Sequence, residues 1–76
     1  MSLQEDLGRT IIRLRKEKGY SQEAFANEAG IDRRYMSDIE NGKRNISIDI
    51  LDRVCNKLGI KISEFFIEVE KGVNVL

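Results

Sequence analysis

The chain has 76 residues, of which 41% are apolar and 34% charged, and its formal net charge is zero. This length suits a single domain, 1–76, whose core is marginal unless its helices pack well or a partner chain covers part of the surface. The composition excludes several classes of protein. No apolar run is long enough to span a bilayer, the single cysteine cannot form an internal disulfide, and there is no histidine for metal binding or acid–base catalysis. We therefore expect a cytoplasmic protein without a metal, a cofactor or a small-molecule ligand.

Charge is unevenly distributed along the chain. Lys and Arg outnumber Asp and Glu over residues 9–44, whereas residues 45–76 are mildly acidic. This asymmetry suits a module that binds DNA with one side and another partner with the other. The alternative is that these charges only form solvated surfaces.

The spacing of apolar residues predicts an all-α chain of five helices, because proline is absent and the helical period recurs throughout. The first helix is predicted over 3–18 and stops at Gly19. Its apolar residues recur at spacings of three to four: Leu3, Leu7, Ile11 or Ile12, and Leu14.

A second and a third helix follow, separated by a short turn. Ser21 is a strong N-cap, and the second helix ends before Gly30. Asp32 is the next N-cap, so the third helix runs over 33–41 and closes at Gly42, a residue suited to a left-handed conformation. The residues of these two helices that face the core are Phe25, Ala26, Ala29, Met36 and Ile39.

The last two helices hold more apolar residues than a small core needs. Ser47 caps the fourth helix, which ends at Gly59, and Ser63 begins the fifth. We assign Leu51, Val54, Leu58 and Phe65 to the core. The remaining candidates are predicted to form a two-fold dimer interface, with an entirely core role as the alternative: Ile60, Ile62, Phe66 and Val69.

Two further features lie near the C-terminus. Cys55 is interpreted as a small buried or half-buried hydrophobe, and a redox sensor is the alternative because Arg53 and Lys57 flank it. The tail 72–76 has no helical period, so we expect it to fray or to lie against a partner chain.

Residues 21–45 have the pattern of a helix-turn-helix, in which the N-terminal residues of the second helix enter the DNA major groove. Here these residues are Arg33 and Arg34, with Ser37 one turn later. Arginine suits this position because its planar guanidinium can donate two hydrogen bonds to the O6 and N7 atoms of guanine. We therefore expect base readout that favours guanine. The alternative is that both arginines are solvated or held in surface ion pairs.

Other polar residues of this region are candidates for phosphate binding. Gln22 begins the second helix, where its side chain and free backbone N–H groups can meet a phosphate oxygen. The cationic loop after the third helix can contact the backbone of the same groove, or can simply be solvated. The predicted phosphate contacts, which include one from the first helix, are Arg15, Gln22, Asn41, Lys43 and Arg44.

Over nearly its whole length the chain resembles the XRE family of lambda Cro/repressor-type helix-turn-helix proteins. The residues that carry the resemblance are Arg13 and Arg15, the run 19–23, Ala26, Gly30, Tyr35, Met36, Ser37, Ile39, Glu40 and Gly42. The resemblance implies a five-helix lambda-repressor-like DNA-binding domain with its helix-turn-helix at the second and third helices.

Within that family, the short length and the patterns at 32–37 and 44–47 are similar to those of the controller proteins of restriction–modification systems. This resemblance implies a homodimer that binds operators upstream of its own and the endonuclease gene, and that both activates and represses. It implies DNA-contacting roles for Arg33, Arg34, Tyr35 and Arg44, a phosphate-contacting role for Gln22, and dimer contacts by the last two helices. Arg34 departs from the small hydroxyl residue expected at its position.

The sequence therefore favours a dimeric regulator of transcription that binds double-stranded operator DNA near a promoter, with RNA polymerase as a further candidate partner. A dimer is expected because one recognition helix reads only a few base pairs. Two-fold pairing would set these helices roughly 34 Å apart and require a pseudo-palindromic operator. The alternatives are a phage or plasmid repressor of the XRE type and an antitoxin that regulates its own gene. No catalysis is expected, because histidine, a glycine-rich phosphate loop and paired carboxylates are lacking.

Overall fold

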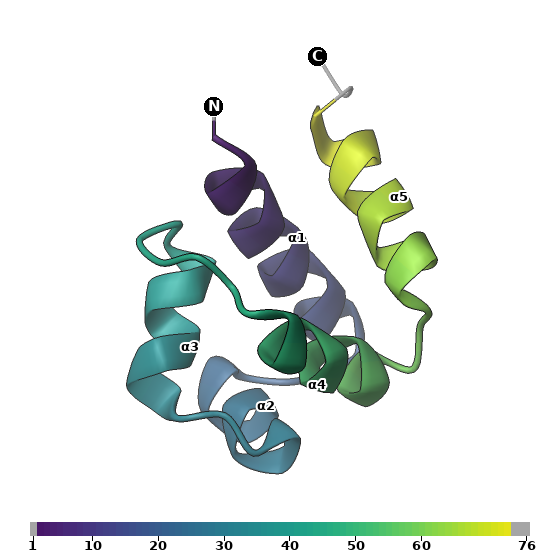
Figure 1. Ribbon diagram of the computed structural model, residues 1–76. Helices are drawn as coiled ribbons and strands as arrows, with labels where there is room; N and C mark the ends of the chain where they lie inside the picture. The colour runs from purple at the N-terminus through teal and green to yellow at the C-terminus, as the bar shows by residue number, and fades with distance from the viewer. Residues whose placement is uncertain (1, 74–76) are drawn as a thin grey trace.

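The computed structural model describes residues 2–73, and every regular element among them is a helix. The elements are α1 (Leu3–Glu17), α2 (Gln22–Ala29), α3 (Arg33–Glu40), α4 (Ile48–Leu58) and α5 (Ile62–Val73) (Figure 1). The prediction of an all-α fold with five helices and a helix-turn-helix at α2 and α3 is confirmed. No helix in this part of the chain is long and apolar enough to cross a membrane.

Side-chain caps determine where the first four helices begin. The predicted N-caps Ser21, Asp32 and Ser47 each accept a hydrogen bond from the backbone N–H three residues later, at 3.1–3.2 Å. Ser2 caps α1 in the same way, and the carboxylate of Glu5 accepts a hydrogen bond from the Ser2 backbone N–H in return. Each cap satisfies an amide that has no partner within its own helix.

The first and third helices end slightly earlier than the sequence predicted. Lys18 and Asn41 were placed inside their helices, but they are the C-caps of α1 and α3. The glycines that follow, Gly19 and Gly42, have φ angles of 84° and 71°. This left-handed conformation turns the chain away from the helix axis, which is why glycine is suited to both positions.

The fifth helix is longer than predicted at both ends. It begins at Ile62, because the Glu64 carboxylate accepts a hydrogen bond from the Lys61 backbone N–H at 2.8 Å and satisfies an amide of the first turn. It also includes Gly72 and Val73, where a tail without helical period was expected. Once a helix has formed, each added residue contributes another backbone hydrogen bond. The rest of the expected tail, 74–76, lies outside the described residues.

Helix α1 lies at the centre of the molecule, with α3 along one side and α5 along the other (Figure 1). Helix α2 packs against both α3 and α4, and α4 packs in turn against α5. Within residues 2–73, the backbone of α3 does not come as close to α4 or α5 as it does to α1 and α2. The position of α3 therefore depends mainly on α1 and α2.

A single apolar core joins all five helices. The side chains predicted for the core from α4 and α5, Leu51, Val54, Leu58 and Phe65, are all buried. Of the two alternatives on α1, Ile11 is fully buried in the core, whereas Ile12 is only half-buried. The other buried apolar side chains are Leu7, Phe25, Ala26, Ile31, Met36, Ile39, Cys55 and Val69.

Gly8 allows α1 and α3 to approach each other unusually closely. A Cβ atom at this position would lie 2.5 Å from the carbonyl oxygen of Glu40 and 2.6 Å from that of Ile39. Both atoms belong to the backbone at the end of α3, so they cannot move aside as a flexible side chain could. The lack of a side chain at Gly8 thus sets the distance between the two helices.

Candidate nucleic-acid interface

The turn between α2 and α3 is held in place by both its backbone and its core contacts. Helix α2 ends at Gly30, whose φ of 70° lies in the left-handed region. The Ile31 N–H donates to the Ala26 carbonyl at 2.8 Å, and the Ile31 side chain is buried in the core. Because Asp32 caps α3 directly afterwards, the first turn of α3 projects from a fixed point on the surface.

Two exposed arginines occupy that first turn, as predicted. The Arg33 guanidinium lies 3.2 Å from the Glu23 carboxylate of α2, and both side chains are about two-thirds exposed. Arg34 is exposed and forms no ion pair within the described residues. Two other carboxylates of these helices, Glu28 and Asp38, pair with Lys57 and Arg44.

The structure brings Tyr35 and Arg44 together. The Arg44 guanidinium lies 4.9 Å from the centre of the Tyr35 ring, in cation–π geometry, and 3.5 Å from the Asp38 carboxylate. Tyr35 and Asp38 lie one turn apart on α3, so both contacts draw the loop that carries Arg44 towards this helix. A residue from the loop and a residue from α3 therefore form one surface.

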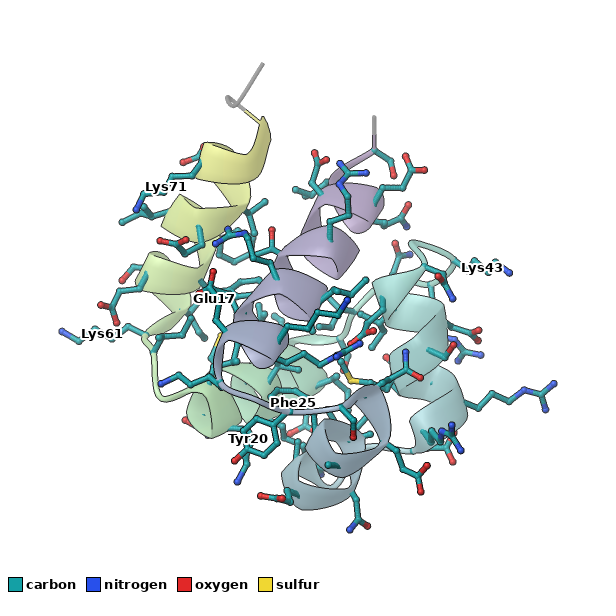
Figure 2. All side chains as sticks on the ribbon, turned by 180° about the vertical axis from the view of Figure 1, so that it is seen from behind. Glu17, Tyr20, Phe25, Lys43, Lys61 and Lys71 are labelled. Carbon is teal, nitrogen blue, oxygen red and sulfur yellow. The ribbon has the colours of Figure 1, made fainter. Side chains whose placement is uncertain are left out.

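The loop that follows α3 presents the remaining candidates. The Asn41 side-chain amide donates to the Ser37 hydroxyl at 3.5 Å, so these two predicted DNA contacts also lie together. Lys43 extends outwards from the loop (Figure 2). The loop is anchored to α1, because Gln4 donates a hydrogen bond to Asn45.

Gln22 lies at the start of α2, as expected, but its side chain is not free. Its amide nitrogen donates to the Glu40 carboxylate at 2.9 Å, and the residue is half-buried. This hydrogen bond links the N-terminus of α2 to the end of α3. Gln22 is thus held at a helix N-terminus, where backbone N–H groups and the helix dipole favour an anion.

Arg15 was predicted to bind phosphate, and the structure contradicts this prediction. Its side chain is only 9% exposed, and it donates to Glu40 from Nε at 2.7 Å and from Nη2 at 2.9 Å. Its Nη1 atom donates to the Tyr20 carbonyl at 3.1 Å. These hydrogen bonds with Glu40 raise the pKa of Arg15. The bidentate pair satisfies the guanidinium inside the protein, so Arg15 holds α1 and α3 together and does not face a ligand.

The interface candidates on α5 and in the loop before it also need one correction. Val69 is 2% exposed and belongs to the core, because it lies four residues after Phe65 on the same inward face. Ile60 and Phe66 are half-buried against the core, and Ile62 is 41% exposed. A further exposed apolar side chain of α5 is Ile67, at 52%.

Cys55 is buried in the core, as its first interpretation predicted. Burial raises the pKa of its thiol, and the nearby Asp52 carboxylate acts in the same direction. Both effects disfavour the thiolate, which is the reactive form of cysteine. This environment argues against the redox-sensor alternative.

Sequence reasoning did not predict the ion pairs that organise this surface, which are formed by the carboxylates of Glu23, Asp38 and Glu40. Glu40 could have been suspected from its position, because it lies one residue after the core residue Ile39 and so borders the buried face of α3. The other two carry no such signal, because their partners depend on how α2 and the loop pack against α3.

Together these contacts form one polar surface along α3, with exposed cations in its first turn and in the loop after it. Planar guanidinium groups can donate paired hydrogen bonds to guanine, and the flanking cations and helix N-terminus can bind phosphate oxygens. The groups that can act in this way are Gln22, Arg33, Arg34, Tyr35, Ser37, Asn41, Lys43 and Arg44. No cluster of potential metal ligands is found among residues 2–73.

Comparison with known proteins finds a matching family and similar proteins. The family model described as helix-turn-helix matches residues 11–65. The control protein C.MunI of a Mycoplasma species is 49% identical over 65 residues, which are 84% of this chain and 88% of that protein.

Solved structures of controller proteins are also similar to this chain. The restriction–modification controller protein C.AhdI from Aeromonas hydrophila is 35% identical, with a TM-score of 0.79 over 83% of this chain and 96% of that one. The controller protein C.Esp1396I, solved as a tetramer in complex with its natural 35-base-pair operator, is 32% identical, with a TM-score of 0.84 over 93% of each chain.

Proposed function

Because the chain belongs to the helix-turn-helix family, and within it to the controller proteins of restriction–modification systems, we propose that it regulates transcription as a homodimer bound to a pseudo-palindromic DNA operator. The observation that carries the proposal is the pair of exposed arginines, Arg33 and Arg34, in the capped first turn of α3. The turn before them is fixed by core contacts, so little backbone freedom is lost when these side chains enter a groove.

We assign separate roles to the two groups of polar residues. Arg33 and Arg34 read base edges, with Tyr35 and Ser37 beside them on the same helix. The loop cations and the N-terminus of α2 bind phosphate oxygens and fix the register of the protein on the duplex. Phosphate contacts supply most of the affinity, so binding weakens steeply as the salt concentration rises.

Occupancy of the operator controls access of RNA polymerase to the promoter, and polymerase is a candidate for direct contact with the bound protein. This function requires no catalysis and no cofactor. The cytoplasm is the proposed place of action, because the proposed target is promoter DNA.

Replacing Arg34 by alanine tests the base-reading role. We expect Arg34→Ala to weaken binding to the true operator by about 1–3 kcal/mol, with little change on random DNA, because a bidentate contact to a base is lost. Fluorescence anisotropy with both duplexes at one salt concentration measures the two affinities. A suitable control is Lys61→Ala, which removes an exposed cation distant from α3 (Figure 2). Equal losses on both duplexes would reduce Arg34 to a phosphate contact.

Dimer formation is proposed through the apolar side chains of α5 and of the loop before it that are exposed or only half-buried: Ile60, Ile62, Phe66 and Ile67. We expect Ile67→Asp to fold normally, since the residue is 52% exposed, and to give monomers, because burying an unpaired carboxylate against the partner is unfavourable. Light scattering and operator titration check this result. Leu3→Asp is a matched control at an exposed apolar residue of α1 and keeps the dimer. An Ile67→Asp protein that remains dimeric would exclude Ile67 from the interface.

A further inference from the structure

The orientation of α3 relative to α4 and α5 is determined largely by the helices that lie between them. Among the described helices, the backbone of α3 approaches only those of α1 and α2, which in turn pack against α4, and α1 also packs against α5. Helix α2 buries only Phe25 and Ala26, so a single large side chain anchors it in the core. Apolar packing of this kind restrains the position of α2 better than its rotation about that anchor. Polar contacts between α2 and α4 are therefore well placed to fix its angle.

A cluster of charged and aromatic side chains provides such contacts. The Lys57 ammonium of α4 lies 2.7 Å from the Glu28 carboxylate of α2 and 5.2 Å from the centre of the Tyr20 ring. The Tyr20 hydroxyl donates to the same carboxylate at 3.4 Å. The Tyr20 ring also packs edge-on against Phe25, so the cluster is connected to the core anchor of α2 (Figure 2). The hydrogen bond from Lys57 lowers the pKa of Glu28, so this carboxylate is charged at neutral pH.

A second contact between the same helices lies at the turn of the helix-turn-helix. Arg53 of α4 donates from Nη1 to the Gly30 carbonyl at 2.7 Å, and its Nη2 atom lies 3.4 Å from Asp49. The carbonyl belongs to the left-handed residue that ends α2. Arg53 and Lys57 lie one turn apart on α4, and together with Glu28 of α2 they line one shallow groove. Together Tyr20, Glu28, Arg53 and Lys57 form what we call the α2–α4 clamp.

We propose that the α2–α4 clamp fixes the angle between the helix-turn-helix and the dimerisation helices, and thereby sets the half-site spacing that the dimer accepts. This inference rests on the proposed function, because it presupposes a dimer that binds two half-sites. The clamp residues are positioning residues: they act through α2 on α3 and touch no DNA.

The half-site spacing that a dimer accepts is a sensitive measure of the angle between its helix-turn-helix and its dimerisation helices. Adding or removing one base pair between half-sites moves the second site by about 3.4 Å and rotates it by about 34° around the duplex. A dimer whose α2 is held at one angle can follow such a change only by straining its own contacts or the DNA. If the clamp is broken, α2 can rotate on α4 and shift the start of α3, within the limit that the contacts of α3 with α1 allow, and this shift absorbs part of the change. Affinity for a single half-site depends on α3 itself and remains the same.

The test is a charge reversal with its rescue. The single variant Lys57→Glu places two carboxylates against each other. The double variant, Glu28→Lys with Lys57→Glu, restores the ion pair with the two charges exchanged, and it keeps the net charge of the natural chain. Each protein is titrated against the operator selected by the natural protein, against versions with one base pair added or removed between half-sites, and against an isolated half-site. Both variants are expected to fold, because the pair is partly exposed.

We expect the natural protein to prefer its own spacing by about tenfold or more. Lys57→Glu should reduce this preference to about threefold or less without changing half-site affinity, and the double variant should restore it. A single variant that keeps the natural preference overturns the clamp and leaves the proposed function intact. A natural protein that binds no two-half-site operator overturns both.

Discussion

Glu40→Gln should remove a large part of the domain's stability at 25 °C. The substitution keeps the shape of the side chain but removes the charge that pairs with the buried Arg15 guanidinium. Breaking a buried ion pair from one side destabilises a protein by about 3–5 kcal/mol. A chain of this size is stable by only about 4–11 kcal/mol in total. Urea denaturation followed by circular dichroism measures the loss.

A double variant separates the charge effect from a general disturbance of the core. Arg15→Met together with Glu40→Leu replaces both partners by apolar side chains and leaves no unpaired charge, so we expect it to recover most of the stability lost in Glu40→Gln. If Glu40→Gln alone stayed within about 1 kcal/mol of the natural protein, the pair would behave as a solvated surface contact.

Gly8→Ala is expected to destabilise the protein by about 1–3 kcal/mol, although alanine favours helix more than glycine does. The added Cβ would lie 2.5 Å from a backbone oxygen of α3, so α1 and α3 must separate. Because this contact also positions α3, operator affinity should fall together with the unfolding free energy. Urea denaturation and a DNA titration measure the two effects.

The same substitution at Gly72 is the control. Gly72 also lies within a helix, but no atom would meet its Cβ within 4 Å. Gly72→Ala should therefore stabilise α5, by up to about 1 kcal/mol. If both alanine variants shifted stability in the same direction and by the same amount, helix propensity would account for Gly8, and the close approach of α1 and α3 would have no energetic role.

The helices and most of the core could be predicted from the sequence because their signals are local. Apolar spacing marks the inward face of each helix, and Ser21, Asp32 and Ser47 mark where helices begin. The exposed arginines at the start of α3 were predicted for the same reason, since an N-cap fixes which residues form the first turn.

Arg15 shows where local reasoning fails. It lies four residues after Ile11 and eight after Leu7, so it shares their inward face, but an arginine is ordinarily assigned to the surface. Its burial depends on Glu40, which is 25 residues away in the sequence. Nothing in the spacing along α1 indicates that this carboxylate will be present.

The contacts between elements were beyond sequence reasoning for a related reason. Arg44 meets Tyr35 only because the loop after α3 turns back at Gly42, and Lys57 meets Glu28 only because α2 and α4 pack together. Val69 was misassigned because the number of apolar residues in α5 suggested a surplus, whereas its spacing from Phe65 places it in the core. In α5, the spacing of apolar side chains predicts which of them are buried better than the number of apolar residues does.

The central claim is that two copies of this chain bind an operator with two-fold symmetry. Its most direct test is the solution mass from light scattering, combined with selection of bound duplexes from a random DNA library. We predict a dimer of about 17 kDa, twice the 8.7 kDa of the chain, that enriches an inverted repeat. A monomer of 8.7 kDa that enriches no sequence would contradict this account.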